Sequence, residues 1–475
     1  DYAKMQELPA AVLASVLCLF VPIQMAGQTW DDHDRSGRFV ARDFGQNYLM
    51  TLQEKGNPII YTNGDNDTFP LWYNQETEGF RTDARTCNLS YLQTDWYIDQ
   101  MKRPAYDSPS LPITWDRVEY VEGQNEYIPI RTEMKAFIDS YFKQANELAA
   151  QGDTTILSLV HSIFGENPYE LKEIINRWML GKNDQLKELL KKTGKDIQLP
   201  LIPTDKEAVR RSGMKIPEAL GDSIPEYMTI TLRDANGNPK RALYKSELMM
   251  LEMLANANWE RPIYMAITVG SENHLGMGNH FMQEGLAYRF TPFDTDKLGV
   301  KIDSEKMYDN LMNKFKFGGI DKPGIYIDEN VMRMCYTHRR IFTQLVGQLI
   351  KEGKKDKALA ALDYAEKMIP SYNVPYDWAN GAFQMAESYY QLGQNEKANK
   401  IIDELANKSL EYMIWYLSLN DNQLAIAGEN FVYNASLLDA EVRLMEKYKS
   451  EKLAKHYSTQ LDQLYNEYVT RMKGK

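Results

Sequence analysis

The sequence predicts an α/β domain with a Rossmann-like mixed sheet and a helical insert, followed by an all-α array of tetratricopeptide-like repeats. One candidate membrane span precedes them. Three observations predict this order: residues 8–27 are apolar, short β-favouring runs alternate with helical patterns from residue 57, and small residues recur at repeat offsets beyond residue 331. We therefore expect a span at 8–27, an α/β domain at 28–325 with an insert at about 128–225, and repeats at 331–475.

The overall composition is that of an ordinary globular chain, with 43% hydrophobic and 25% charged residues among 475. The net charge of −11 argues against nucleic acid as a partner, because phosphate backbones require a basic face. The three cysteines, Cys18, Cys87 and Cys335, are far apart. They predict neither a disulfide framework nor a metal site.

The first element is the apolar stretch Leu8 to Gly27, which is long enough to cross a bilayer. Lys4 precedes it and an acidic turn follows it. This order favours a cytoplasmic N-terminus. A signal peptide and a buried helix of a soluble domain are the alternatives.

The acidic turn that follows holds Asp31, Asp32, His33 and Asp34. Carboxylates and an imidazole this close together could bind a divalent cation. The alternative is a solvated, membrane-proximal turn with Asp–Arg pairing. Residues 39–56 then have the apolar spacing of an amphipathic helix.

A β-α-β-α unit over residues 57–102 is the centre of the predicted domain. Residues 58–61 predict a buried strand, and Asn63-Gly64 ends it. We expect Asp67 or Thr68 to cap the next helix, with Pro70 in its first turn. A second strand at 84–89 and a second helix from 94 follow. Such units form parallel pairs and bind ligands where strands end and helices begin.

The rest of the domain combines helices with further strands. Helical patterns cover 131–150 and 154–193, with a break near Gly165 to Pro168, and a Pro-rich stretch covers 195–225. A strand at 226–232 should pair with 242–245 across an Asn-Gly turn. A helix at 247–256 and strands at 262–268 and 285–290 follow, so that one mixed sheet could hold both halves.

Beyond residue 331 the pattern is helical and repeats itself. Gly353 and Gly393 occupy equivalent positions 40 residues apart, and the extra residues fit the Pro- and aromatic-rich segment 371–378. Residues 431–472 predict two more amphipathic helices. Arrays of this kind present a surface to a peptide or to a neighbouring domain. A structural brace is the alternative.

The loop after the first strand is the candidate site. Asp65 and Asp67 have a spacing that can hold a divalent cation, and helix capping is the alternative. Trp72 and Trp96 could stack on a sugar ring, or they could be core residues. No complete nucleophile or cofactor motif is present. No cofactor is certain, although a divalent cation is possible. The candidate ligand-binding residues are Asn63, Asp65, Asn66, Asp67, Trp72, Asp95 and Trp96, and the candidate metal ligands are Asp65, Asp67, Asp31, Asp32, His33 and Asp34.

Over residues 8–300 the chain resembles the C-terminal part of a bacterial membrane-protein family whose multi-span N-terminal half is similar to protein O-mannosyltransferases. The stretches that carry the resemblance are WDDHDRSGR at 30–38, TNGDNDTFPLW at 62–72, NLS at 88–90 with TDWY at 94–97, and NWERPIY at 258–264. The resemblance implies that 8–27 is the last span in a bacterial inner membrane, with 28–475 on the extracytoplasmic (periplasmic) side. It also implies that the glycosyl-transfer centre lies outside these residues, and it assigns no catalytic residue to them.

The expected function is therefore the ligand- or acceptor-binding part of a membrane glycosyltransferase-like protein. A protein or glycan acceptor would be its partner, and the span would hold it in the membrane. The alternative is a non-catalytic scaffold whose helical repeats bind another protein. A stand-alone enzyme that uses Asp65, Asp67 and residues 31–34 around a metal is a third possibility.

Overall fold

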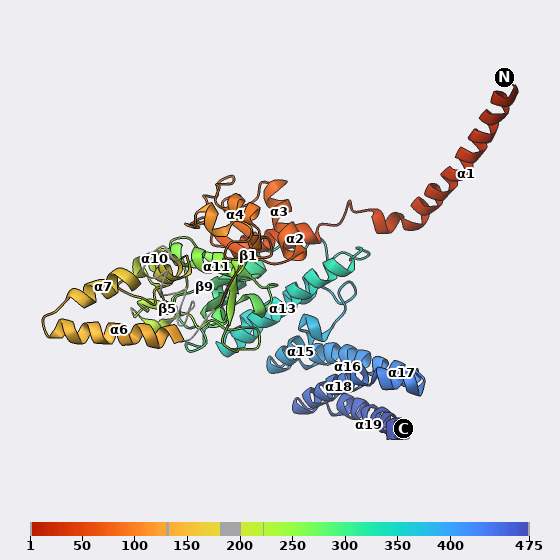
Figure 1. Cartoon of the computed structure of the whole chain (residues 1–475). Helices are drawn as coiled ribbons and strands as arrows, with labels where there is room; N and C mark the ends of the chain where they lie inside the picture. The colour runs from red at the N-terminus through yellow and green to blue at the C-terminus, as the bar shows by residue number, and fades with distance from the viewer. Residues whose placement is uncertain (1, 130–132, 181–200, 222, 474–475) are drawn as a thin grey trace. The chain divides into compact units, whose positions relative to one another are not determined.

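The computed structural model describes residues 2–129, 133–180, 201–221 and 223–473 (Figure 1). The chain divides into two compact units. The α/β unit comprises Phe44–Lys316 and Gly347–Lys354, and the helical unit comprises Asp1–Asp43, Phe317–Val346 and Lys355–Lys475.

A five-stranded mixed sheet is the core of the described α/β unit. Its strands are β1 (Ile59–Thr62), β2 (Arg85–Asn88), β7 (Ile263–Ala266), β8 (Phe281–Gln283) and β9 (Ala287–Phe290), in the order β2-β1-β7-β9-β8. β1 runs parallel to β2 and β7, whereas β9 is antiparallel to β7 and β8. Every residue of β1, β2 and β7 is buried, as expected for strands covered on both faces. The predicted mixed sheet that unites both halves is confirmed.

The helix after β1, α3 (Asp65–Glu76), begins earlier than the sequence predicts. Gly64, with φ of 103°, makes the turn directly after the strand, a conformation that glycine adopts without steric cost. Pro70 therefore lies inside the helix and not in its first turn. Helix α2 (Val40–Thr51) approaches closely here, because a Cβ on Gly45 would lie 2.3 Å from the carbonyl oxygen of Pro70.

The remaining elements of this unit surround the sheet and extend from it. Helices α6 and α7 lie side by side as an antiparallel pair (Figure 1). The bounds are α4 Asp95–Met101, α5 Arg117–Tyr120, β3 Tyr127–Pro129, α6 Glu133–Ala150, α7 Thr155–Phe164, α8 Leu171–Glu173, β4 Leu201–Pro203, α10 Lys206–Arg211, β5 Tyr227–Thr229, β6 Ala242–Tyr244, α11 Lys245–Asn256 and α12 Ser304–Asp309. The predicted helical stretch 154–193 breaks where expected: α7 ends at Phe164, Gly165 has a φ of 84°, and helical turns resume at Leu171. Its residues 181–193 lie outside the described residues.

The predicted hairpin forms its turn but not its strand pair. The Asp234 N–H donates to the Asn238 carbonyl at 2.9 Å, as in a tight turn. However, β5 pairs with β4, and β6 pairs with β3. The prediction of a β5–β6 ladder is therefore wrong. A cross-strand contact helps to explain why β6 pairs with β3: the Tyr244 ring packs edge-on against Tyr127 at 5.8 Å.

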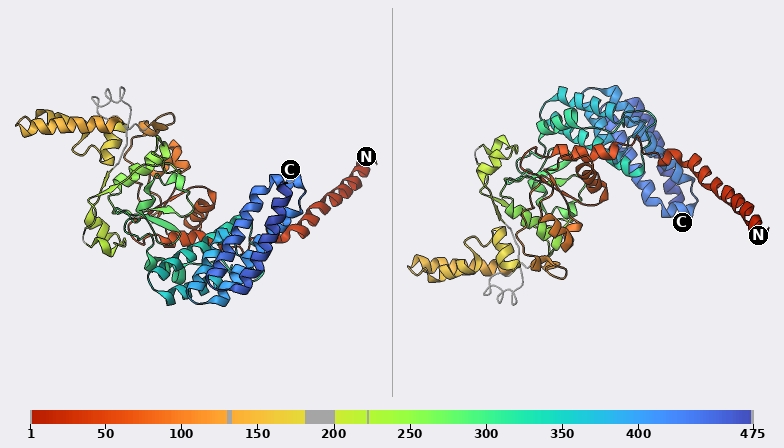
Figure 2. Two further views of the ribbon diagram at one scale, coloured as in Figure 1. Left: turned by 90° about the horizontal axis from the view of Figure 1, so that it is seen from below. Right: turned by 90° about the horizontal axis from the view of Figure 1, so that it is seen from above.

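The described part of the helical unit from α13 onward consists of packed helices (Figure 2). α15 packs on α16, and α18 packs against both α16 and α19. Gly353 and Gly393 have φ of 73° and 74° at the turns after α13 and α15, which is the helix-ending role expected of them. The identification as tetratricopeptide repeats stays a prediction. The bounds are α13 Glu329–Lys351, α14 Lys355–Met368, α15 Ala382–Gln391, α16 Asn395–Ser418, α17 Asp421–Ile426, α18 Gly428–Lys447 and α19 Glu451–Lys473.

The N-terminal helix α1 (Tyr2–His33) contains the predicted span. Its stretch Glu7–Trp30 has a mean hydropathy of 2.1, and its most apolar window has no buried residue. The helix is therefore long and apolar enough to cross a membrane.

Candidate functional site

The loop that follows β1 lies at the carboxyl edge of the sheet, between the ends of β2 and β7. Asp67 is 2% exposed. Its Oδ2 atom accepts hydrogen bonds from the Asn63 N–H at 3.2 Å and from the Thr268 hydroxyl at 2.9 Å. Burial raises the pKa of this carboxyl. The Tyr48 hydroxyl lies 2.9 Å from Thr268 Oγ1, so a chain of polar groups passes from the loop across β7 to α2.

A second polar network ties the loop to β2. Thr68 Oγ1 lies 2.8 Å from the Thr62 hydroxyl and accepts from Asn88 Nδ2 at 2.8 Å. The Ser90 hydroxyl donates to Asn63 Oδ1 at 2.5 Å. These bonds fix the loop against both parallel strands. They fit the interpretation in which Asp67 holds the turn. The prediction that Asp67 or Thr68 caps the helix is wrong, because Gly64 is the cap residue of α3 and no side chain caps it.

The structure separates the loop residues predicted from the sequence into two groups. Asn63 and Asp67 take part in the internal networks, whereas Asp65 and Asn66 are exposed. A ligand at this edge would therefore meet Asp65 and Asn66 first. Asp95 lies on α4 and accepts from Arg117 Nη2 at 3.4 Å.

Aromatic side chains form a continuous row beside this loop. The Trp72 ring stacks on Tyr91 at 6.0 Å with an interplanar angle of 9°, and on Phe69 at 5.7 Å. Tyr91 in turn contacts Trp96 at 5.9 Å. Trp96 is 55% exposed and Phe69 is 47% exposed. The structure thus brings the two predicted tryptophans into one surface, with Trp72 inside the row and Trp96 at its open end.

The row borders a cavity of about 360 Å³ at the outer edge of β2. α3 contributes Trp72, Gln75 and Glu76 to its lining, and α4 contributes Trp96, Tyr97 and Gln100. β2 contributes Arg85, which is 6% exposed. Aromatic faces together with planar polar side chains are suited to a ring that carries hydroxyl groups.

The predicted acidic turn at 31–34 belongs to the helical unit, and its first three residues form the end of helix α1. Asp34 accepts from the Ser36 N–H at 2.9 Å and from its hydroxyl at 2.6 Å, which lowers the pKa of Asp34. His33 Nδ1 lies 2.9 Å from the Thr29 carbonyl oxygen. The side chains of Asp31 and Asp32 lie outside the described residues.

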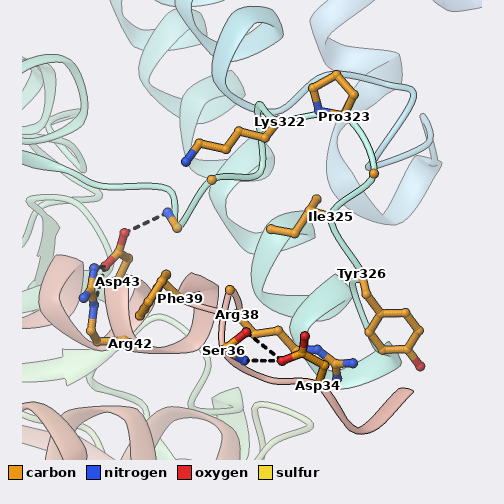
Figure 3. Close-up of a pocket in the computed structure, with 14 residues that line it drawn as sticks. Asp34, Ser36, Arg38, Phe39, Arg42, Asp43, Lys322, Pro323, Ile325 and Tyr326 are labelled. Atoms are coloured by element: carbon orange, nitrogen blue, oxygen red, sulfur yellow. Dashed lines mark hydrogen bonds and ion pairs between the residues drawn. The ribbon is translucent and has the colours of Figure 1, made fainter. Parts of the chain in front are cut away.

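Asp34 also lines a cavity of about 860 Å³ within the helical unit (Figure 3). Asp43 accepts from Arg42 Nη2 at 2.7 Å and from the Gly318 N–H at 2.7 Å. Lys322 extends into the space from the opposite side (Figure 3). Asp34 and Asp43 therefore both have hydrogen-bond partners within the helical unit.

No group of three or more His, Cys, Asp or Glu side chains that could hold a metal ion occurs among the described residues. Asp65 and Asp67 are thus not joined by a third acidic or imidazole ligand in the described part of the chain. The predicted divalent cation stays a prediction.

Sequence reasoning missed two sets of buried charges. Arg85 faces the cavity from within a strand, and Glu284 accepts from the Tyr264 hydroxyl at 2.8 Å and pairs with Lys306. Arg289 Nη1 lies 3.6 Å from Glu284 Oε1, and both side chains are almost fully buried. The available signal was a single charged residue inside a predicted strand, as at Arg85 and Arg289.

The comparison with protein families gives a match to the α/β unit. The family described as TMEM260-associated domain 2 matches residues 41–309, which is more than half of the chain. TMEM260 is an O-mannosyltransferase-like membrane protein. Searches of curated proteins and of solved structures returned no match.

The matched range contains the whole five-stranded sheet, the loop at 63–68 and the cavity beside β2. The candidate span in α1 agrees with a membrane protein. The chain therefore belongs to the TMEM260-associated domain 2 family.

Proposed function

We propose that this chain is the extracytoplasmic ligand- or acceptor-binding part of a membrane glycosyltransferase-like protein, and that the cavity beside β2 binds a sugar ring. One observation carries the proposal: Trp72 and Trp96 line a single cavity together with Gln75, Gln100 and Arg85. Family membership supports the glycosyl-transfer setting.

The chemistry of the lining matches that of a sugar. The C–H face of a pyranose packs against an aromatic ring, and its hydroxyls bond to planar amide, carboxylate and guanidinium groups. Trp96 offers the exposed ring at the open end of the aromatic row. Trp72 is stacked on both Phe69 and Tyr91 and so holds the wall in place.

The location is part of the same proposal. Lys4 before the apolar stretch and acidic residues after it favour a cytoplasmic N-terminus. Residues 28–475 would then lie on the extracytoplasmic side, in a bacterial periplasm as the resemblance implies. A glycan or protein acceptor would approach from that side.

The test is saturation-transfer NMR and calorimetric titration of the full chain in lipid nanodiscs with a panel of mono- and disaccharides. We expect at least one sugar to bind and Trp96→Ala to weaken it at least tenfold. Trp415→Ala in α16 is the matched control, because Trp415 is also 55% exposed. Binding of no sugar, or equal binding by the Trp96→Ala protein, would overturn the proposal.

A second candidate function is a scaffold that binds a peptide through the helical unit. It is favoured by exposed aromatic side chains, Tyr412 and Trp415 on α16 and Tyr433 on α18, beside cavities of about 750 and 540 Å³. Surface aromatics of this size mark protein-binding sites. A photo-crosslinker at residue 412 tests this function. A defined partner lost in Trp415→Ala but kept in Trp96→Ala would favour it, and the absence of any partner would count against it.

A further inference from the structure

The floor of the cavity beside β2 holds a buried positive charge. Arg85 Nη2 donates to the carbonyl oxygens of Gln100 at 2.9 Å and Arg103 at 3.1 Å, at the end of α4. Its Nη1 atom is buried and has no hydrogen-bond partner among the described residues. A buried guanidinium donor without an acceptor is costly, so the site favours an acceptor from outside the chain.

A second, partly buried guanidinium is close enough to Arg85 for the two charges to interact. Arg261 donates to the carbonyl oxygens of Asn57 at 2.6 Å and Ser110 at 2.7 Å and to the Ser108 hydroxyl at 3.1 Å. Burial, and then the charge of Arg85, lower the pKa of Arg261 to about 10. The two positive charges therefore repel one another.

No carboxylate in the described part of the chain forms an ion pair with either arginine. The carboxylate in the cavity lining is Glu76, which is exposed at the rim and accepts from the Tyr106 hydroxyl. The floor thus stays positive while the chain as a whole carries a net charge of −11. An anionic group entering the cavity would relieve the repulsion between Arg85 and Arg261.

We infer that the cavity beside β2 selects a sugar that carries an anionic substituent, with the ring against Trp96 and Trp72 and the anion directed towards Arg85. This inference rests on the proposed sugar-binding function and adds the charge of the ligand to it. A uronic acid carboxylate and a sugar phosphate ester offer the same chemistry. Both supply planar or tetrahedral oxygens that match a guanidinium group.

The test is a calorimetric titration of the full chain in nanodiscs of uncharged lipid. The four probes are methyl β-glucopyranoside, methyl β-glucuronoside, glucose 6-phosphate and inorganic phosphate. We expect at least one anionic sugar to bind at least tenfold more tightly than the neutral glucoside. Comparing the two anionic sugars separates the carboxylate from the phosphate source. Inorganic phosphate should bind at least tenfold more weakly than the preferred anionic sugar, because it makes no aromatic contact.

Variants then assign the selectivity to one residue. Arg85→Gln should remove the preference for the anionic sugar and leave the neutral glucoside within about threefold of its original affinity. Arg103→Gln is the matched control, because it removes the same charge from an exposed position at the end of α4 and should keep the preference. Arg85→Lys keeps the charge and should keep part of the preference.

The outcomes separate the two proposals. Equal binding of neutral and anionic sugars by the original protein overturns the charge selectivity and leaves sugar binding intact, and this result does not depend on any variant folding. Binding of none of the sugars overturns both proposals. Inorganic phosphate that binds as tightly as the sugar phosphate overturns the inference, because the cavity would then be a simple anion site. Preference retained in a folded Arg85→Gln protein also overturns it.

Discussion

Replacing Glu441 by Gln should stabilise the helical unit at pH 8 and have a much smaller effect in acid. Glu441 lies on α18 and is fully buried. Its Oε1 atom accepts from the Trp378 indole N–H at 2.6 Å and from the Ser409 hydroxyl at 3.3 Å. Oε2 is buried without a partner in the described part of the chain. Burial raises the pKa of this carboxyl to about 7.

The sign and the magnitude follow from the two protonation states. The folded pKa of Glu441 is raised above the unfolded value of 4.5, so the folded state binds the proton more tightly. Stability is then highest below pH 4.5 and is lost as the pH rises to about 7. The difference of about 2.5 between the two pKa values corresponds to about 3 kcal/mol. Gln keeps the acceptor for Trp378 and carries no charge, so this loss should be absent.

The assay is hydrogen exchange of the α18 amides in the full chain, read by mass spectrometry at several pH values and corrected for intrinsic exchange. Relative to the original protein, Glu441→Gln should gain about 3 kcal/mol of opening free energy between pH 4 and pH 8. Any fixed packing effect of Gln cancels in this difference. Glu446→Gln, on the same helix but exposed, is the control. A Glu441→Gln difference that does not change with pH would refute the reasoning.

Three further predictions concern packing, the loop and acid sensitivity. Gly45→Ala should lower the free energy of unfolding by about 1–3 kcal/mol or more, because its Cβ would lie 2.3 Å from a backbone carbonyl of α3. Gly347→Ala meets no atom within 4 Å and should be neutral or stabilising by up to about 1 kcal/mol. Asp67→Ala should cost about 1–3 kcal/mol, since it leaves buried donors unpaired, whereas exposed Asp65→Ala should change stability by no more than about 0.5 kcal/mol. Urea unfolding followed by circular dichroism measures the free energy of unfolding of all four variants. Equal effects of the two glycine variants, or of the two aspartate variants, would contradict the corresponding prediction. Burial lowers the pKa of His338 to about 3, so its stabilising contribution is lost as the pH falls below about 6.5. His338→Gln should therefore reduce the loss of stability between pH 7 and pH 4 in thermal melts, and an unchanged loss would count against this assignment.

The sheet could be predicted from the sequence because its signals are local. The apolar run 58–61 with Asn63-Gly64 after it indicated β1, the stretch 84–89 indicated β2, and the helix between them favoured a parallel pair. The pairing of β5 could not be predicted in the same way. The Asn-Gly turn between β5 and β6 is a local signal. However, β5 pairs with β4 and β6 pairs with β3, and both partners lie further away in the sequence.

The candidate site was predictable only in part, for a related reason. The loop at 63–68 and the tryptophans stand out by residue type and position. What Asp67 does depends on Thr268, about 200 residues later in the chain, and no spacing rule reports such a contact. Arg85 gave a weak signal as the one charged residue of its strand. Its lack of an ion-pair partner becomes visible only when the surroundings of β2 are known.

The central strand pair of the sheet has a consequence for how this chain is made. β1 pairs with β7 in the register Ile59 to Ile263, across about 200 intervening residues. At a synthesis rate of about 5–20 residues per second, β1 waits roughly 10–40 seconds for its second neighbour. During that interval the pair β1–β2 has an apolar edge open to other chains. While β7 is still missing, this exposed edge is where a chaperone would be needed most.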